Sequence, residues 1–261
     1  MSTPSEREDH AGLGGLAKRE MPADDRALLR IGAISIILGV LLGLGVIPFH
    51  GGTPPEDLQA VLPQIAANDY WVVVHFAQFV GGVLMLVGYV ALYRSITQGA
   101  SVGVSGALAR MGIVVAVVAE GVYAINQAVD GIANKFVAQE WVSAASAEKA
   151  DAFRVADAVR HIEIGTSSLW TLSVGIVLLF FGLAIALGRA YPRLLGWAAI
   201  AIGVGLFAYA LNLAYNGFYS GTLLGIVGGL AGILQTLWIL ILAFFLWRKA
   251  RGAGHRVRAQ P

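Results

Sequence analysis

The chain contains no cysteine, and this absence excludes several kinds of chemistry at once. Without a thiol there is no disulfide, no thiolate nucleophile and no cysteine-based metal site. Charged residues are also scarce, at 13% of the chain, whereas soluble domains carry roughly 25%. The formal net charge of +2 is too small to indicate a partner that is a nucleic acid.

The signatures of several enzyme classes are missing as well. The sequence has no G-x-S-x-G nucleophile elbow, no Walker motif, no G-x-G-x-x-G dinucleotide signature and no H-E-x-x-H zinc motif. We therefore predict no catalytic residue and expect no cofactor. The polar N-terminal stretch also lacks the short apolar core and the cleavage site of a signal peptide, so the first apolar run is expected to remain as a membrane anchor.

What the sequence does have is apolar length, because 57% of its residues are hydrophobic and most of them fall in six runs. A membrane-crossing helix needs about 20 apolar residues, and each run comes close to or exceeds that length. The fold class predicted is all-α, a polytopic membrane protein with a bundle of six transmembrane helices. The runs are 31–49, 71–93, 111–130, 165–188, 194–216 and 222–247, between a polar, disordered tail (1–30) and a basic tail (248–261).

The distribution of positive charge predicts the orientation. The two tails, the second–third connection and the fourth–fifth connection together carry 14 of the 18 Lys and Arg residues. Positive charge stays on the cytoplasmic side, so both termini are expected to be cytoplasmic, in the plasma membrane. The basic C-terminal tail should attract anionic lipid headgroups. Glycine pairs such as Gly39/Gly43 and Gly225/Gly229 indicate close helix packing, either within the chain or between the chains of an oligomer.

Two connections on the opposite side are expected to contain structure. Thr53–Glu56 reads as a capping box that starts a short helix through Leu62, which Pro63 would end or bend. The connection 131–164 is expected to be a long loop that contains the start of a helix. Ser146 is the predicted N-cap, and the helix would continue into the fourth span.

A polar stripe on the third apolar run is the most informative local pattern. Glu120, Tyr123, Gln127, Asp130 and Asn134 recur at i, i+3, i+7, i+10 and i+14, which places them on one face of an α-helix. An acidic side chain near the middle of a membrane helix costs roughly 2.5–3.5 kcal/mol, so this face should meet other helices or water rather than lipid.

The favoured functional hypothesis is a pocket, open to the outer face, that binds or transports a small solute or ion. Glu120 would form its floor and serve as the candidate for proton coupling. The ligand-binding residues predicted are Glu120, Tyr123, Gln127, Asp130, His75, Gln78, Gln235 and Asn212. A non-catalytic membrane scaffold, in which the same polar groups only hold the helices together, is the alternative from another functional class.

A metal-dependent membrane hydrolase is a third interpretation. His75, Asp130 and His161 supply the nitrogen and oxygen ligands that zinc accepts. His75 and His161 could instead ligate a b-type haem, although a second histidine pair near the other face, usual in such carriers, is missing.

Several segments together resemble a known group of proteins. They are HFAQFVGGVLMLVGYVALYRS (75–95), ALARMG (107–112), QAVDG (127–131) and VRHIEIGTSSLW (159–170). This pattern is similar to uncharacterised bacterial six-helix membrane proteins of actinobacterial type, over roughly residues 31–190. The resemblance implies six spans and carries no established activity.

Overall fold

The computed structural model describes residues 21–51, 57–98, 103–218 and 221–252, and across these ranges every regular element is helical. Six helices are long and apolar enough to cross a membrane, which confirms the prediction of an all-α, multi-pass membrane protein. They are α1 (Ala23–Gly45), α3 (Trp71–Thr97), α4 (Val104–Ala128), α6 (Lys149–Leu187), α7 (Arg193–Asn216) and α8 (Leu223–Gly252).

The outer surface of the bundle is covered by large apolar side chains. Leu41 on α1 is 60% exposed and Ile233 on α8 is 62% exposed. An apolar surface of this extent would be unfavourable in water, whereas lipid chains are its natural surroundings. The bundle is therefore embedded in a bilayer.

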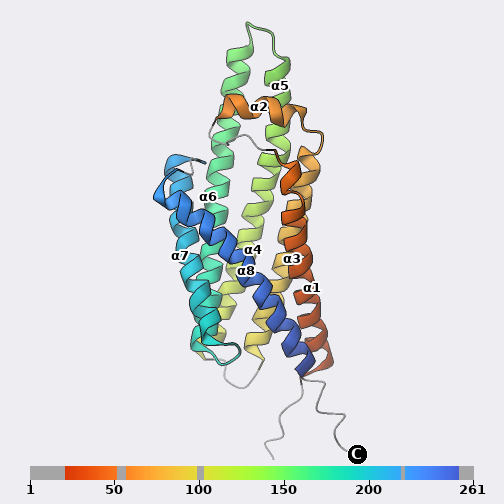
Figure 1. Ribbon diagram of the computed structural model, residues 1–261, viewed down its shortest axis with the longest axis vertical. Helices are drawn as coiled ribbons and strands as arrows, with labels where there is room; N and C mark the ends of the chain where they lie inside the picture. The colour runs from red at the N-terminus through yellow and green to blue at the C-terminus, as the bar shows by residue number, and fades with distance from the viewer. Residues whose placement is uncertain (1–20, 52–56, 99–102, 219–220, 253–261) are drawn as a thin grey trace, which may run out of the picture.

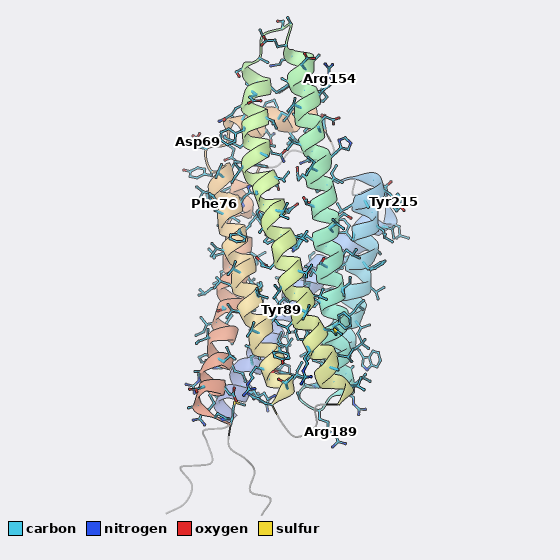
Figure 2. The ribbon with its side chains drawn as sticks, turned by 180° about the vertical axis from the view of Figure 1, so that it is seen from behind. Asp69, Phe76, Tyr89, Arg154, Arg189 and Tyr215 are labelled. Carbon is cyan, nitrogen blue, oxygen red and sulfur yellow. The ribbon has the colours of Figure 1, made fainter. Side chains whose placement is uncertain are left out.

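The helices run alternately up and down, and α8 crosses the bundle diagonally from α7 to α1 (Figure 1). The start of α1 and the end of α8 lie at the same end of the bundle, which we call the tail end. Figure 2 shows Arg189 at the tail end and Arg154 at the far end of the molecule. Helix α1 begins at Ala23, directly after Pro22, and has two aspartates in its first turn, both of which favour a helix start. The last part of the tail that was predicted to be disordered is therefore helical. Residues 1–20 and 253–261 lie outside the described residues.

The helix predicted to begin outside and to continue into the fourth span is present, but the part of the connection before it, for which no helix was predicted, is helical too, so the region is a helical hairpin. A π-helix (η2, Val129–Ala133) joins α4 directly to α5 (Asn134–Ser143), so one continuous rod runs from Val104 to Ser143. The chain then turns and re-enters α6 at Lys149, so Ser146 is not the N-cap. The hairpin of α5 and the first turns of α6 projects beyond the other helices (Figure 1), and we call this the hairpin end.

A short helix, α2 (Leu58–Ala67), lies across the base of this hairpin. Its buried residues Leu62 and Ile65 pack with Trp71, Ala138 and Ala156 in a small apolar core. Lys135 on α5 fixes the end of α2, since its ammonium group donates to three backbone carbonyls there at 2.9–3.0 Å.

The start and end of α2 differ from the prediction. Pro63 lies inside the helix and does not end it, because the missing N–H removes one hydrogen bond while buried side chains hold the helix on both sides. The helix begins after Asp57, whose carboxylate accepts from the N–H of Ala60. The predicted capping box at 53–56 lies outside the described residues.

Polar contacts tie the helices together at the tail end. Arg94 on α3 donates two hydrogen bonds to the buried carboxylate of Asp25 on α1, at 2.6 and 3.1 Å. Lys249 near the end of α8 donates to the carbonyl of Ser95 at 2.6 Å. These contacts join α1, α3 and α8 where their ends converge.

Glycines allow the closest backbone contacts between α6 and α7. A Cβ atom at Gly175 would lie 2.9 Å from the carbonyl oxygen of Gly203, and one at Gly182 would lie 2.9 Å from that of Gly196. The two helices therefore pack backbone against backbone along their length. Gly39 packs against Gly81 of α3 in the same way, whereas Gly43 has no atom within 4 Å of its Cβ position.

Candidate functional site

A cavity of about 370 Å³ lies inside the bundle, among α1, α3, α4, α6 and α8. We call it the Glu120 cavity. Its walls are mostly apolar, with Val40, Met85, Val174 and Ile239 among the lining residues. Cavities of about 300–1,000 Å³ with apolar walls and few polar groups are typical of small-molecule sites.

Glu120 is the acidic group of this cavity. Its Oε1 atom is buried and has no hydrogen-bond partner among the described residues. The carboxylate lies directly against α3, because a Cβ atom at Gly82 would be 2.6 Å from Oε1 and 2.9 Å from Oε2. Gly82 therefore provides the space that the carboxylate occupies. A buried carboxylate oxygen without a donor is costly, so a donor brought by a ligand would bind favourably here.

Other polar and aromatic groups surround Glu120 in the cavity wall. Gln78 on α3 and Gln235 on α8 line the same space. Tyr123, one turn along α4 from Glu120, stacks on Trp170 of α6, with ring centroids 4.5 Å apart. The cavity thus offers one acid, two amides and an aromatic wall, a set of groups that can position a ligand without reacting with it.

The cavity has an open side between α1 and α8. Gly43 on α1 and Gly232 on α8 both line it, and neither has any atom within 4 Å of its Cβ position. Figure 1 shows that α8 lies against α1 toward the tail end and diverges from it toward the hairpin end. The neighbouring side chains Leu41 and Ile233 are exposed on the apolar surface of the bundle.

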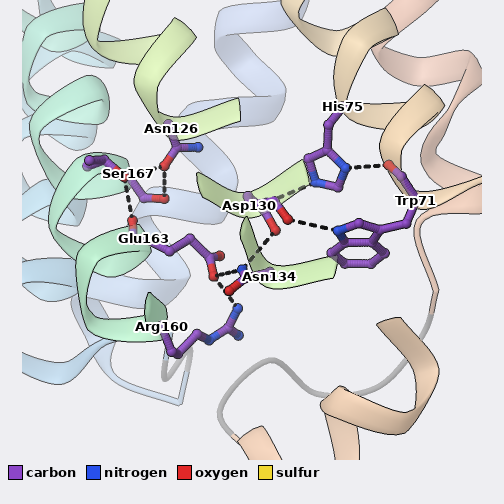
Figure 3. Close-up of polar contacts among 9 residues, drawn as sticks. Trp71, His75, Asn126, Asp130, Asn134, Arg160, Glu163 and Ser167 are labelled. Atoms are coloured by element: carbon purple, nitrogen blue, oxygen red, sulfur yellow. Dashed lines mark hydrogen bonds and ion pairs between the residues drawn. The ribbon is translucent and has the colours of Figure 1, made fainter. Parts of the chain in front are cut away.

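A second polar group of residues lies at the hairpin end, under α2 (Figure 3). The Nδ1–H of His75 donates to the carbonyl oxygen of Trp71 at 2.7 Å, since a carbonyl can only accept. Nε2 of His75 lies 3.0 Å from Oδ2 of Asp130, without the angular geometry of a hydrogen bond. The indole N–H of Trp71 donates in turn to the backbone carbonyl of Asp130 at 2.8 Å.

The backbone of η2 makes the close approach of His75 possible. A Cβ atom at Gly131 would lie 2.4 Å from the Cβ atom of His75. Only glycine leaves enough room at this position. His75 is consequently 2% exposed and in contact with Asp130.

A buried ion pair on α6 and α5 borders this group. Arg160 donates to Oε2 of Glu163 at 2.7 Å, and Asn134 donates to the same oxygen at 2.6 Å (Figure 3). The guanidinium group of Arg160 also stacks over the ring of Phe218, 4.4 Å from its centroid. The charge of Glu163 is therefore balanced by Arg160, which leaves Asp130 as the acid that faces the histidines.

His50 completes the group from the segment after the first span. Its ring lies 5.1 Å from that of His75 and 4.7 Å from the indole of Trp71, measured between centroids. Burial lowers the pKa of the His50 imidazole below its ordinary value, which favours the neutral ring. The nitrogen and oxygen atoms of His50, His75 and Asp130 lie within 4.8 Å of one another, and we call these three residues the His75 cluster. A cavity of about 250 Å³ adjoins it.

The single pocket predicted from the sequence is thus divided into two separate places. The Glu120 cavity is lined by Glu120, Tyr123, Gln78 and Gln235. His75 and Asp130 belong to the His75 cluster.

Two predicted ligand-binding residues line neither cavity. Gln127 is buried between the two places. Asn212 accepts hydrogen bonds from Asn216 and from Thr222, and so fastens the turn between α7 and α8.

The histidine set predicted for a metal or a haem is not brought together. His161 is exposed on α6, where it contacts Asp157. Sequence reasoning missed His50, which takes the place expected for His161. Its signal was its position directly after the first span, at the same expected depth as His75.

The comparisons with known proteins do not assign the chain to a family. Protein-family models, curated proteins and solved structures were all searched, and none matches the chain.

Proposed function

We propose that this multi-pass membrane protein binds a small amphipathic molecule in the Glu120 cavity, with the carboxylate of Glu120 as its polar anchor. The observation that carries the proposal is the buried, unpartnered Oε1 atom inside a cavity of ligand size. Membrane proteins carry an acid at this depth at a cost, and such residues usually serve a ligand or an ion.

The chemistry of the ligand follows from the walls. A hydrogen-bond donor or a cationic group would face Glu120, and Gln78 and Gln235 would add further polar contacts. The remaining surface is apolar or aromatic, so the rest of the molecule would be a hydrocarbon chain or a ring. An amphipathic amine satisfies both requirements, whereas an inorganic ion would leave most of the cavity unfilled.

The route into the cavity follows from its open side. A polar solute would have to arrive from water, but the gap between α1 and α8 faces lipid. Amphipathic molecules partition into the bilayer and would reach the gap by lateral diffusion. We propose that the protein lies in the plasma membrane with its tail end on the cytoplasmic side, because Lys and Arg are in excess at that end.

A series of ten-carbon ligands tests this function. n-Decylamine, n-decanol and n-decanoate share one apolar chain and differ in their headgroup. Binding to the protein in lipid nanodiscs would be followed through tryptophan fluorescence, because Trp170 lines the cavity, with empty nanodiscs as the blank. We expect the amine to bind roughly tenfold more tightly than the alcohol, and the carboxylate to bind least.

Glu120→Gln keeps the shape of the side chain and removes its charge, so it should abolish the preference for the amine. Gly121→Ala is the matched control, because Gly121 is adjacent, faces away from the bundle and has nothing within 4 Å of its Cβ position. If all three headgroups bind equally well, or if Glu120→Gln leaves their order unchanged, Glu120 is not the anchor and the proposal fails.

A further inference from the structure

The His75 cluster is separate from the Glu120 cavity, and its atoms are arranged like the inner ligands of a metal ion. Two imidazoles and one carboxylate come from three different parts of the chain, the segment after η1 (Ile47–Phe49), α3 and η2. Metal–nitrogen and metal–oxygen bonds are about 2.0–2.2 Å long, so ligands of one ion lie within about 4.4 Å of each other. The described atoms lie within 4.8 Å, so a shift on the order of 1 Å would bring them to the roughly 3.0–3.6 Å that separates neighbouring ligands of one ion.

The hydrogen bonds around His75 are those of a metal ligand. Because its Nδ1–H is donated to the carbonyl of Trp71 at 2.7 Å, a neutral His75 presents the bare lone pair of Nε2 to Asp130. Metal-bound histidines nearly always donate their other ring N–H to a carbonyl or a carboxylate in this way. While His75 is neutral, these two acceptor atoms, 3.0 Å apart, repel each other, and a cation bound beside both would remove that repulsion as a proton on Nε2 does.

Asp130 is also held in place on more than one side. Asn134 donates to its Oδ1 atom over 3.4 Å, which leaves Oδ2 directed at His75. The indole of Trp71 fixes the backbone carbonyl of the same residue. His75 and Asp130 are thus oriented by their neighbours before any ion binds, as a preformed site requires of its ligands.

Charge and space fit a divalent cation. Arg160 pairs with Glu163, and Asp130 is the carboxylate that lies against His75, so it would supply the negatively charged ligand of the cluster. The adjoining cavity of about 250 Å³ is lined by His50 and Asp130, which leaves room for water to complete the coordination. Three protein ligands and an open position are the pattern of reactive rather than purely structural metal sites.

We infer that His50, His75 and Asp130 form a binding site for a divalent transition-metal ion at the hairpin end of the bundle, with water in the remaining positions. The ligand set suits zinc, or iron and manganese, which share the arrangement of two histidines and one carboxylate. Magnesium and calcium prefer ligands that are all oxygen and do not fit the two imidazoles.

The chain has few other residues that could bind a transition metal, because it contains only five histidines and no cysteine. A triple variant with His10, His161 and His255 changed to Ala keeps only His50 and His75. Metal-free protein without a histidine tag would be incubated with equimolar Zn²⁺, Fe²⁺ and Mn²⁺, and the metal retained would be measured by mass spectrometry. Co²⁺ would serve as the spectroscopic probe, since its d–d bands report coordination.

Both the wild-type protein and the triple variant should retain about one equivalent of one metal and show Co²⁺ bands. Adding His50→Ala should lower the affinity at least as much as the roughly 10–100-fold that loss of an outer-shell partner causes. His50 is half-buried and lies outside the spanning helices, so the metal-free variant should unfold at an unchanged denaturant midpoint. Failure of the triple variant to bind metal, or equal binding with and without His50, would overturn the site. The first result would indicate that His75 and Asp130 form a plain ion pair.

Discussion

Replacing Gly131 by Ala should destabilise the protein, because η2 has no space for a side chain at that position. The added Cβ atom would lie 2.4 Å from the Cβ atom of His75, whereas ordinary contacts begin at 3.4 Å. The two atoms would therefore have to separate by about 1.0 Å, the difference between these distances. Such a shift moves either the backbone of η2 or the start of α3.

The magnitude follows from what the shift breaks. Trp71 is almost fully buried, and lengthening the 2.8 Å hydrogen bond from its indole N–H on α3 to the carbonyl of Asp130 on η2 by about 1.0 Å would take it beyond hydrogen-bonding range. Overpacking costs about 1–3 kcal/mol and the lost hydrogen bond about 1 kcal/mol. The better helix propensity of alanine offsets up to about 1 kcal/mol. The net loss of unfolding free energy should be about 1–4 kcal/mol.

Reversible unfolding in mixed micelles, titrated with sodium dodecyl sulfate, would measure this loss. Gly121→Ala is again the matched control, since it lies on the same continuous rod and has nothing within 4 Å of its Cβ position. Its effect should be neutral or stabilising, by up to about 1 kcal/mol. The reasoning is refuted if both alanine variants change the unfolding free energy by the same amount and in the same direction.

Three further predictions test other parts of the molecule. Gly82→Ala places a Cβ atom 2.6 Å from Oε1 of Glu120 and should weaken n-decylamine binding roughly tenfold, as measured in nanodiscs; unchanged affinity would argue against the described position of the carboxylate. Asp25→Asn leaves its half-exposed guanidinium partner on α3 without a counter-charge and should lower the unfolding free energy in the same titration, whereas no change would mean that the pair contributes nothing. The absence of cysteine allows a direct test of orientation, because Ser146→Cys should react with a membrane-impermeant maleimide in intact cells and Gly252→Cys only after lysis; the reverse pattern would invert the topology.

The spanning helices could be predicted from the sequence because their signal is local. A run of about 20 apolar residues has few alternatives in a bilayer, since every backbone polar group must be satisfied within the segment. The same reasoning correctly indicated that Glu120 faces the interior, where it lines a cavity with Tyr123. It also indicated that the helix of the fourth span begins well before the membrane.

The hairpin could not be predicted in the same way. Asn134–Ser143 mixes polar and apolar residues, so it looked like a loop once the apolar run had ended. It is helical because α2 and α6 cover its buried face at Ala138, a contact between segments far apart in the sequence. The effect of Pro63 on α2 was overestimated for the same reason. Tertiary packing outweighs the loss of one backbone hydrogen bond, so the helix continues past Pro63.

The division of the polar stripe depended on depth, which the spacing pattern does not weigh. A regular α-helix carries Glu120 and Asp130 on one face, but about 15 Å apart along its axis. The structure places the first in a cavity and the second, at the start of η2, against His75. His50 was missed because its proximity to His75 arises from the fold of the segment after α1 and not from its spacing.

The π-turn at Val129–Ala133 also has a consequence for the evolution of this chain, because a π-turn is an inserted residue that the helix has absorbed. A homologue shortened by one residue there would regain a plain α-helix, and everything after the deletion would rotate by about 100°. Its equivalent of Asn134 would then turn away from α6. A single-residue gap in an alignment at this point would therefore mark where the lineage acquired, or gave up, the contact of Asn134 with Glu163.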